Sequence, residues 1–128
     1  MALRQALQLR QGRLPLLHKM AAENGGVEGR TAFLAAEAGD ETALEVCRVY
    51  VEYLAEGVTN LVNILQPEIL AVGGGVAGAP DHLLMEPLRR IVEAECYPRH
   101  AGKLPRILRA ELGNDAGIIG AALLRRAI

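Results

Sequence analysis

A short apolar run that ends in three consecutive glycines constrains this chain more than any other feature. The run is Ile-Leu-Ala-Val at residues 69–72, and Gly73, Gly74 and Gly75 follow it directly. A continuous apolar run of this length, bounded by turn residues, is typical of a strand that is buried on both faces of a parallel sheet. Parallel strands are joined by a long crossover, usually a helix. The run therefore predicts an α/β domain in which helices cover a short parallel sheet.

A second strand is expected at residues 106–112, where apolar residues partly alternate with charged ones. Between the two strands lies a helical pattern that begins at Pro80 or Asp81 and ends before Pro98. Pro87 should kink that helix or split it in two. A strand–helix–strand unit of this kind places its strands parallel, so that their carboxyl ends share one edge of the sheet.

The longest helix is predicted for residues 40–65. Asp40 is a suitable N-cap residue, and Pro67 should end the helix. Apolar residues repeat at intervals of three or four, which predicts one buried face. Those residues are Leu44, Cys47, Val51, Leu54, Val58, Leu61 and Leu65. The opposite face is charged, and we interpret it as solvated; it carries Glu45, Arg48, Glu52 and Glu56.

Four shorter helices are expected at residues 2–10, 14–24, 31–38 and 116–126. No capping residue precedes the first of them, which indicates a helix whose beginning is missing. The last one carries several small residues on one face, which predicts close packing against a neighbour. We expect one compact domain, with residues 1–39 as a helical lead-in segment and residues 40–128 as an α/β lobe.

Charge and composition argue against several classes of partner. The net charge of −1 comes from mixed acidic and basic residues, so nothing suggests nucleic acid or an anionic membrane. No apolar run approaches the roughly 20 residues of a membrane span. The polar N-terminus has no signal-peptide core, so the cytoplasm is the expected location.

The cysteines and histidines have no ligand-like spacing. Cys47 and Cys96 form no CxxC pair, and we interpret them as buried thiols rather than as a disulfide or a metal site. His18, His82 and His100 are expected to be structural residues. The sequence therefore predicts no metal site.

Two glycine-containing turns should meet at the carboxyl edge of the sheet. One is the triple glycine with Val76, and the other is Gly113-Asn114-Asp115 after the second strand. In open α/β sheets ligands bind at this edge, and glycine lets backbone approach a ligand closely. The pattern favours a nucleotide or phosphate site. Its spacing matches neither the Rossmann nor the P-loop motif, so purely structural turns remain an alternative. Asn114 or Asp115 fits a helix cap better than a catalytic group.

Two long stretches resemble the ROK family of glucokinases. Residues 60–77, NLVNILQPEILAVGGGVA, look like the family's late segment, in which a helix ends in an Asn-Pro or Gln-Pro turn before a strand and a triple glycine. Residues 111–124, ELGNDAGIIGAALL, look like its closing strand–turn–helix. Two shorter stretches, at residues 30–33 and 38–40, resemble the lead-in to the long helix. The resemblance thus spans nearly the whole chain.

The resemblance implies a helix-rich part of the second lobe of an actin-like, ribonuclease H-like ATPase fold, with a short parallel sheet. The lobe formed by residues 40–128 would then lie on the nucleotide side of a cleft that binds ATP and a hexose. By the same resemblance, ATP would be bound through Gly73, Gly74, Gly75, Val76 and Asn114. The parent protein would phosphorylate the 6-hydroxyl of a sugar, with Mg²⁺ accompanying ATP.

The family's catalytic residues are not found in this sequence. Its N-terminal lobe carries a glycine-rich phosphate loop with an aspartate, and an Asn-Asp pair whose aspartate is the base for the sugar hydroxyl. A cysteine-rich zinc motif precedes the segment that this chain resembles. Phosphoryl transfer depends on positioning and on charge neutralisation around Mg²⁺. We therefore assign no catalytic and no metal-binding residue here, and expect the chain alone to be inactive.

Two alternatives have a different function. The chain could be a fragment of a sugar-responsive ROK-type transcriptional regulator, although it resembles no helix-turn-helix, or a non-catalytic interaction module. Open edges of a short sheet invite pairing with another chain, which predicts a homo-oligomer. The identity of the sugar does not follow from the sequence.

Overall fold

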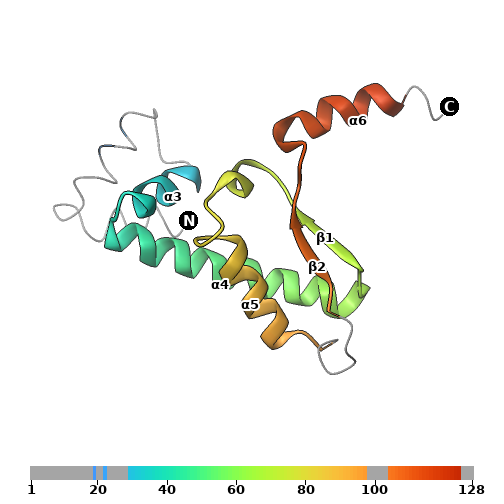
Figure 1. The fold of residues 1–128 in the computed structure, drawn as a ribbon, viewed down its shortest axis with the longest axis horizontal. Helices are drawn as coiled ribbons and strands as arrows, with labels where there is room; N and C mark the ends of the chain where they lie inside the picture. Colours follow the sequence, from blue (N-terminus) through green and yellow to red (C-terminus); the bar gives the residue numbers. More distant parts are fainter. Residues whose placement is uncertain (1–18, 20–21, 23–28, 98–103, 125–128) are drawn as a thin grey trace.

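The computed structural model describes Lys19, Ala22 and residues 29–97 and 104–124. Its elements are, in order, α3 (Gly29–Glu37), α4 (Glu41–Leu65), β1 (Ile69–Val72), η1 (Gly75–Gly78), α5 (Met85–Glu95), β2 (Arg106–Arg109), η3 (Gly113–Asp115) and α6 (Ala116–Leu124). Figure 1 shows α4 running along the body, with α3 beside one end, the strands near the other end, and α6 extending away from them. The helix expected at residues 2–10, and most of that at 14–24, lie outside the described residues.

The two strands form a parallel pair, as predicted. Ile69 lies opposite Arg106, and the register continues to Val72 opposite Arg109. The second strand is shorter than the predicted range of 106–112, because β1 ends at the glycines. The Ala110 N–H bonds to the Val72 carbonyl at 2.8 Å, and beyond it no strand among the described residues lies beside the chain.

The prediction that β1 is buried on both faces is wrong. Leu70 and Val72 pack against the apolar core, whereas Ala71 is exposed and Ile69 is 53% exposed. Both faces of a parallel sheet are usually covered by helices. In the described part of the chain, packed helices cover only one of them, so alternate residues of an apolar run remain exposed.

The long helix has the predicted bounds. The Asp40 carboxylate accepts hydrogen bonds from the N–H groups of Thr42 and Ala43, at 2.9 and 3.0 Å, and so caps the first turn. At the other end Gln66 takes a left-handed conformation, φ 46°, and its N–H donates to the carbonyl of Val62. Pro67 then follows, and the chain turns into β1.

The buried face of α4 is rotated from the predicted one. Cys47, Val51 and Val58 are buried as expected, but Leu65 is 68% exposed. Leu44 and Leu61 are exposed too, and the other buried positions of α4 are Ala43, Ala55, Thr59 and Val62. Alanines on this face let α3 and α5 pack closely, so the small residues rather than the leucines lie at the contact.

The helix between the strands begins later than predicted and is not kinked. Residues 80–84 form turns, in which the Leu84 N–H donates to the Pro80 carbonyl, and α5 starts at Met85. Pro87 therefore lies in the first turn of α5, where the missing N–H removes no intrahelical bond and the fixed φ suits the helix.

One apolar core joins α3, α4, α5 and the strands. Within it, α4 contacts mainly α3 and α5, and α5 in turn contacts β2. Both cysteines are free and buried, as predicted. Burial raises the pKa of the Cys47 thiol from 9.0 to about 11, so this thiol stays protonated at neutral pH.

The last helix forms at residues 116–124, within the predicted range, but among the described residues it lacks the expected close packing. Among the described residues α6 has none that is buried, and its main contact is with η3. None of the helices in the described ranges is both long and apolar enough to cross a membrane.

The Asp40 cap provides a test of the helical core. Asp40→Ala should lower the free energy of unfolding by about 1 kcal/mol, because two N–H groups of the first turn lose their acceptor. Urea unfolding followed by circular dichroism measures this change. Asp40→Asn, which keeps a side-chain oxygen acceptor, is the control and should retain most of the stability. Equal losses in both variants would contradict a capping role.

Candidate functional site

The glycine turn after β1 has a backbone shape that requires glycine. Gly74 has φ 86° and ψ −176°, a region that residues with a side chain essentially do not occupy. An added Cβ on Gly73 would lie 3.4 Å from the Cβ of Ala110, the residue that follows β2. The chain then enters η1, where the Ala77 N–H donates to the Gly74 carbonyl at 3.1 Å. The turn thus holds backbone, rather than side chains, at the carboxyl end of β1.

A cavity of about 500 Å³ lies beside this turn. It is bounded by the first turn of α3, by the glycine turn with η1, and by the start of η3. The described residues that line it are Gly29, Arg30, Gly74, Gly75, Val76, Gly78 and Gly113. The two glycine turns therefore meet, as expected from two parallel strands that end at the same edge.

The predicted site residues have different places around the cavity. Gly74, Gly75 and Val76 line it directly. Gly73 is not among the described lining residues, and its nearest neighbour for an added Cβ is Ala110. Asn114 belongs to η3, next to Gly113.

Three lining residues were not predicted from the sequence: Gly29, Arg30 and Gly78. Gly29 and Arg30 form the start of α3, and α3 contacts η1 across the cavity. An added Cβ on Gly29 would lie 3.4 Å from a methyl group of Val76. The sequence does place a basic residue at a helix start, but the approach of α3 to η1 is a tertiary contact that no local pattern indicates.

The lining favours binding of an anionic or polar ligand over proton transfer. The first N–H groups of a helical turn have no partner within that turn, and in η1 these are the N–H groups of Gly75 and Val76. Arg30 adds a positive charge. Among the described lining residues there is no carboxylate, histidine or cysteine to act as an acid, base or nucleophile. The described residues also contain no cluster of three or more such side chains that could hold a metal ion.

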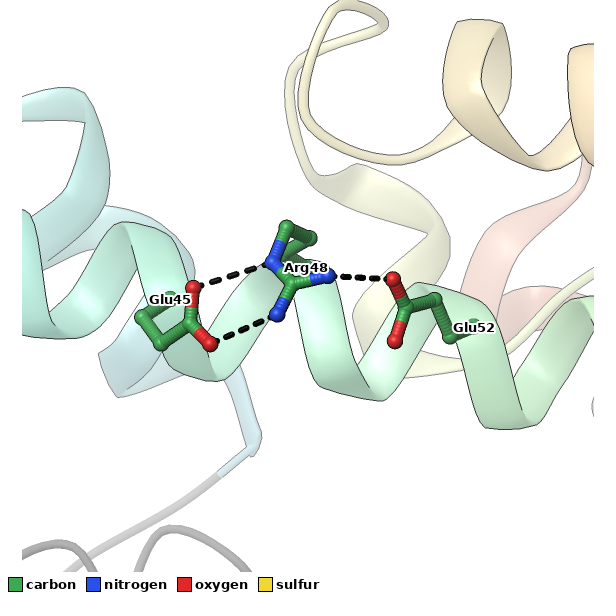
Figure 2. Close-up of polar contacts among 3 residues, drawn as sticks. All are labelled: Glu45, Arg48 and Glu52. Carbon is green, nitrogen blue, oxygen red and sulfur yellow. Dashed lines mark hydrogen bonds and ion pairs between the residues drawn. The ribbon is translucent and has the colours of Figure 1, made fainter.

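The charged face of α4 is a solvated network, as predicted. Figure 2 shows Arg48 between Glu45 and Glu52. The N–O distances are 2.7 and 2.9 Å to Glu45 and 2.5 Å to Glu52. The hydrogen bonds that Arg48 donates to Glu45, and the charges of both carboxylates, raise the pKa of the guanidinium above its ordinary value. The three side chains border a groove of about 640 Å³ between α4 and α5. Since these charges satisfy one another at the surface, they do not indicate a binding site.

Comparison with known proteins gives consistent matches to sugar kinases. The ROK family profile matches residues 1–128. A glucokinase of Halalkalibacterium halodurans is 43% identical over 103 residues, which is 80% of this chain and 30% of that protein. A glucokinase of Thermotoga maritima is 35% identical over 84% of this chain and 33% of its own length.

Structural comparison agrees with the sequence matches. The crystal structure of a ROK family glucokinase from Streptomyces griseus, in complex with glucose and AMPPNP, matches 99% of this chain with a TM-score of 0.83 and 26% identity. The match covers 41% of that protein. The chain thus has the fold of the matched part of that glucokinase, and it spans about a third of the length of the curated relatives it matches.

A side chain should change the free energy of unfolding differently at Gly74 and at Gly75, the two glycines of the turn that line the cavity. Gly74→Val should lower the free energy of unfolding by about 1–3 kcal/mol, because the branched residue must adopt a positive φ. Gly75→Val should cost no more than about 0.5 kcal/mol, since Gly75 has no positive φ and open space around its Cβ position. Urea unfolding of both variants measures the difference. A loss at Gly75 as large as that at Gly74 would contradict this geometry.

Proposed function

The chain belongs to the ROK family, and on that basis we propose that it is the C-terminal, nucleotide-binding portion of an ATP-dependent glucokinase or related hexose kinase. Its homologues are glucokinases and other sugar kinases, and its fold is part of the actin-like ATPase fold of ROK glucokinases. The intact protein would transfer the terminal phosphoryl group of ATP to the 6-hydroxyl of the sugar.

The observation that carries the proposal is the glycine-lined cavity at the carboxyl edge of the sheet. Gly74 and Gly75 have no side chain, so a planar base or a ribose can approach the backbone closely. The N–H groups of Gly75 and Val76 are available as donors, and Arg30 suits a phosphate oxygen. In the proposal, Gly73, which follows β1, and Asn114 of η3 also contribute to binding the nucleotide on this adenosine side of the site.

The chain would bind and orient the nucleotide rather than catalyse the transfer. When bound, ATP supplies the phosphoryl group, and Mg²⁺ is expected to accompany it in the intact enzyme. The described lining residues include no carboxylate that would hold the metal or remove the sugar proton. Both tasks therefore belong to the part of the family's fold that this chain does not span.

The remaining expectations follow from this assignment. Residues 40–128 would form the nucleotide-side lobe and residues 1–39 would lead into it, with α3 closing the cavity. We propose ATP and a hexose as ligands, with no nucleic-acid or membrane partner, and a homo-oligomer in the cytoplasm. The named relatives are kinases, which favours this function over a transcriptional regulator or an interaction module.

A chimeric enzyme tests the proposal. The matching segment of the Halalkalibacterium halodurans glucokinase is replaced by this chain, and glucose phosphorylation is followed in a coupled assay. The chimera should phosphorylate glucose with ATP, whereas the rate measured with the chain alone should not exceed background. Turnover by the chain alone, or an inactive but folded chimera, would contradict the proposal.

Gly75→Val in the chimera tests the nucleotide site itself. Its side chain would occupy the cavity without straining the backbone, so KM for ATP should rise at least tenfold, about 1.4 kcal/mol, with KM for glucose nearly unchanged. Gly57→Val is the matched control, since Gly57 lies in α4 with open space around it. An unchanged KM for ATP in a folded Gly75→Val chimera would remove this cavity as the adenosine site.

A further inference from the structure

Arg109, the last residue of β2, is bonded to the segment that follows η1. Its Nη2 donates to the carbonyl of Ala79 at 2.6 Å and to the Asp81 carboxylate at 2.5 Å. Ala79 is the C-cap residue of η1, and its own N–H donates to the Val76 carbonyl at 2.9 Å. A single guanidinium nitrogen thus links the end of β2 to the exit of the glycine turn.

We propose that Arg109 is a positioning residue, which holds η1 so that Gly75 and Val76 keep their place along the cavity. We call the two hydrogen bonds of Arg109, to Ala79 and to Asp81, the clamp. Its effect on ATP binding rests on the proposed function, whereas the clamp itself does not. The geometry explains why a clamp is needed. The segment enters through flexible glycines, and a 3₁₀ turn of four residues has little stability of its own.

The entrance of η1 is connected to β1 only through Gly73 and Gly74, and its exit has few other side-chain hydrogen bonds. Among the described residues, the side-chain hydrogen bonds that reach residues 73–81 from elsewhere in the chain both come from Arg109. The buried methyl groups of Ala77 and Ala79 add apolar contact but no directional bond. Arg109 therefore determines the orientation of the exit.

Arg109 acts on the site through the backbone, not as a lining residue. Its side chain is directed at Ala79 and Asp81, and it is absent from the described lining of the cavity. The ion pair with Asp81 is half exposed, at 37% and 56% of the two side chains, and pairs of this kind contribute little to global stability. A positioning role should therefore appear as a local change around η1, with the midpoint of unfolding almost unmoved.

Amide hydrogen exchange on the 128-residue chain tests the clamp directly. The reporters are the N–H groups of Ala77 and Ala79, which bond to the carbonyls of Gly74 and Val76. Arg109→Met should speed their exchange at least fivefold, while Asp81→Asn, which leaves the bond to Ala79 in place, should have a smaller effect. Arg106→Met is the matched control, an exposed arginine on the same strand, and should change neither amide.

Two outcomes of this measurement would overturn the clamp. One is unchanged exchange of Ala77 and Ala79 in a folded Arg109→Met chain. The other is an equal effect of Arg106→Met, which would indicate general loosening of β2 rather than a specific tie.

The chimeric glucokinase tests the consequence for the nucleotide. Arg109→Met should raise KM for ATP about fivefold with kcat and KM for glucose within twofold, and Arg109→Lys, which keeps the charge, should recover part of the loss. A KM for ATP equal to that of the parent chimera would overturn the positioning role, even if the exchange rates change. Should the parent chimera itself be inactive, the proposed kinase function fails, and the exchange experiment still decides whether the clamp exists.

Discussion

The parallel pairing of β1 and β2 is the constraint on which the arrangement of the site depends. The register pairs Val72 with Arg109, the last residues of the two strands, so both strands end at the same edge of the sheet. The glycine turn, which follows β1, and η3, which follows β2, therefore begin at the same edge. A shift of the register by a single residue would reverse the faces of β2 and move Arg109 away from the exit of η1.

Close helix packing brings a third element to that edge. Alanines on the buried faces of α3 and α4, such as Ala35, Ala43 and Ala55, are almost completely buried and let the helices approach. As a result the first turn of α3 contacts η1, and Arg30 reaches a cavity that is otherwise lined mainly by glycine. The positive charge of the site thus depends on packing between helices that lie well before the glycine turn in the chain.

Several apolar side chains remain outside the core that these contacts form. They are found on the outer face of β1, at the end of α4 and along α6, as with Ile69, Leu65 and Ile118. Apolar surface of this extent is typical of a region that contacts further protein. It accords with a chain that spans about a third of the length of its curated relatives.

For the described residues, the sequence by itself determined the order of the main helices and strands. Local signals sufficed for the bounds of α4, because the Asp40 cap and the Pro67 stop act within a few residues of themselves. The parallel pair followed from the strand–helix–strand connection. The glycine turn followed from the backbone freedom of glycine. The resemblance to ROK glucokinases added the family, and the comparisons confirmed it.

Only the tertiary structure decided which faces are buried and which residues meet at the cavity. Periodicity predicted a leucine face for α4, but burial depends on what lies opposite, and the alanine side is the one that α3 and α5 cover. The same reason explains the exposed face of β1 and the late start of α5, where Pro87 fits the first turn instead of breaking a longer helix. Arg30 and Arg109 were not predicted because each acts through a partner far away in the chain, and no pattern of neighbouring residues encodes such a contact.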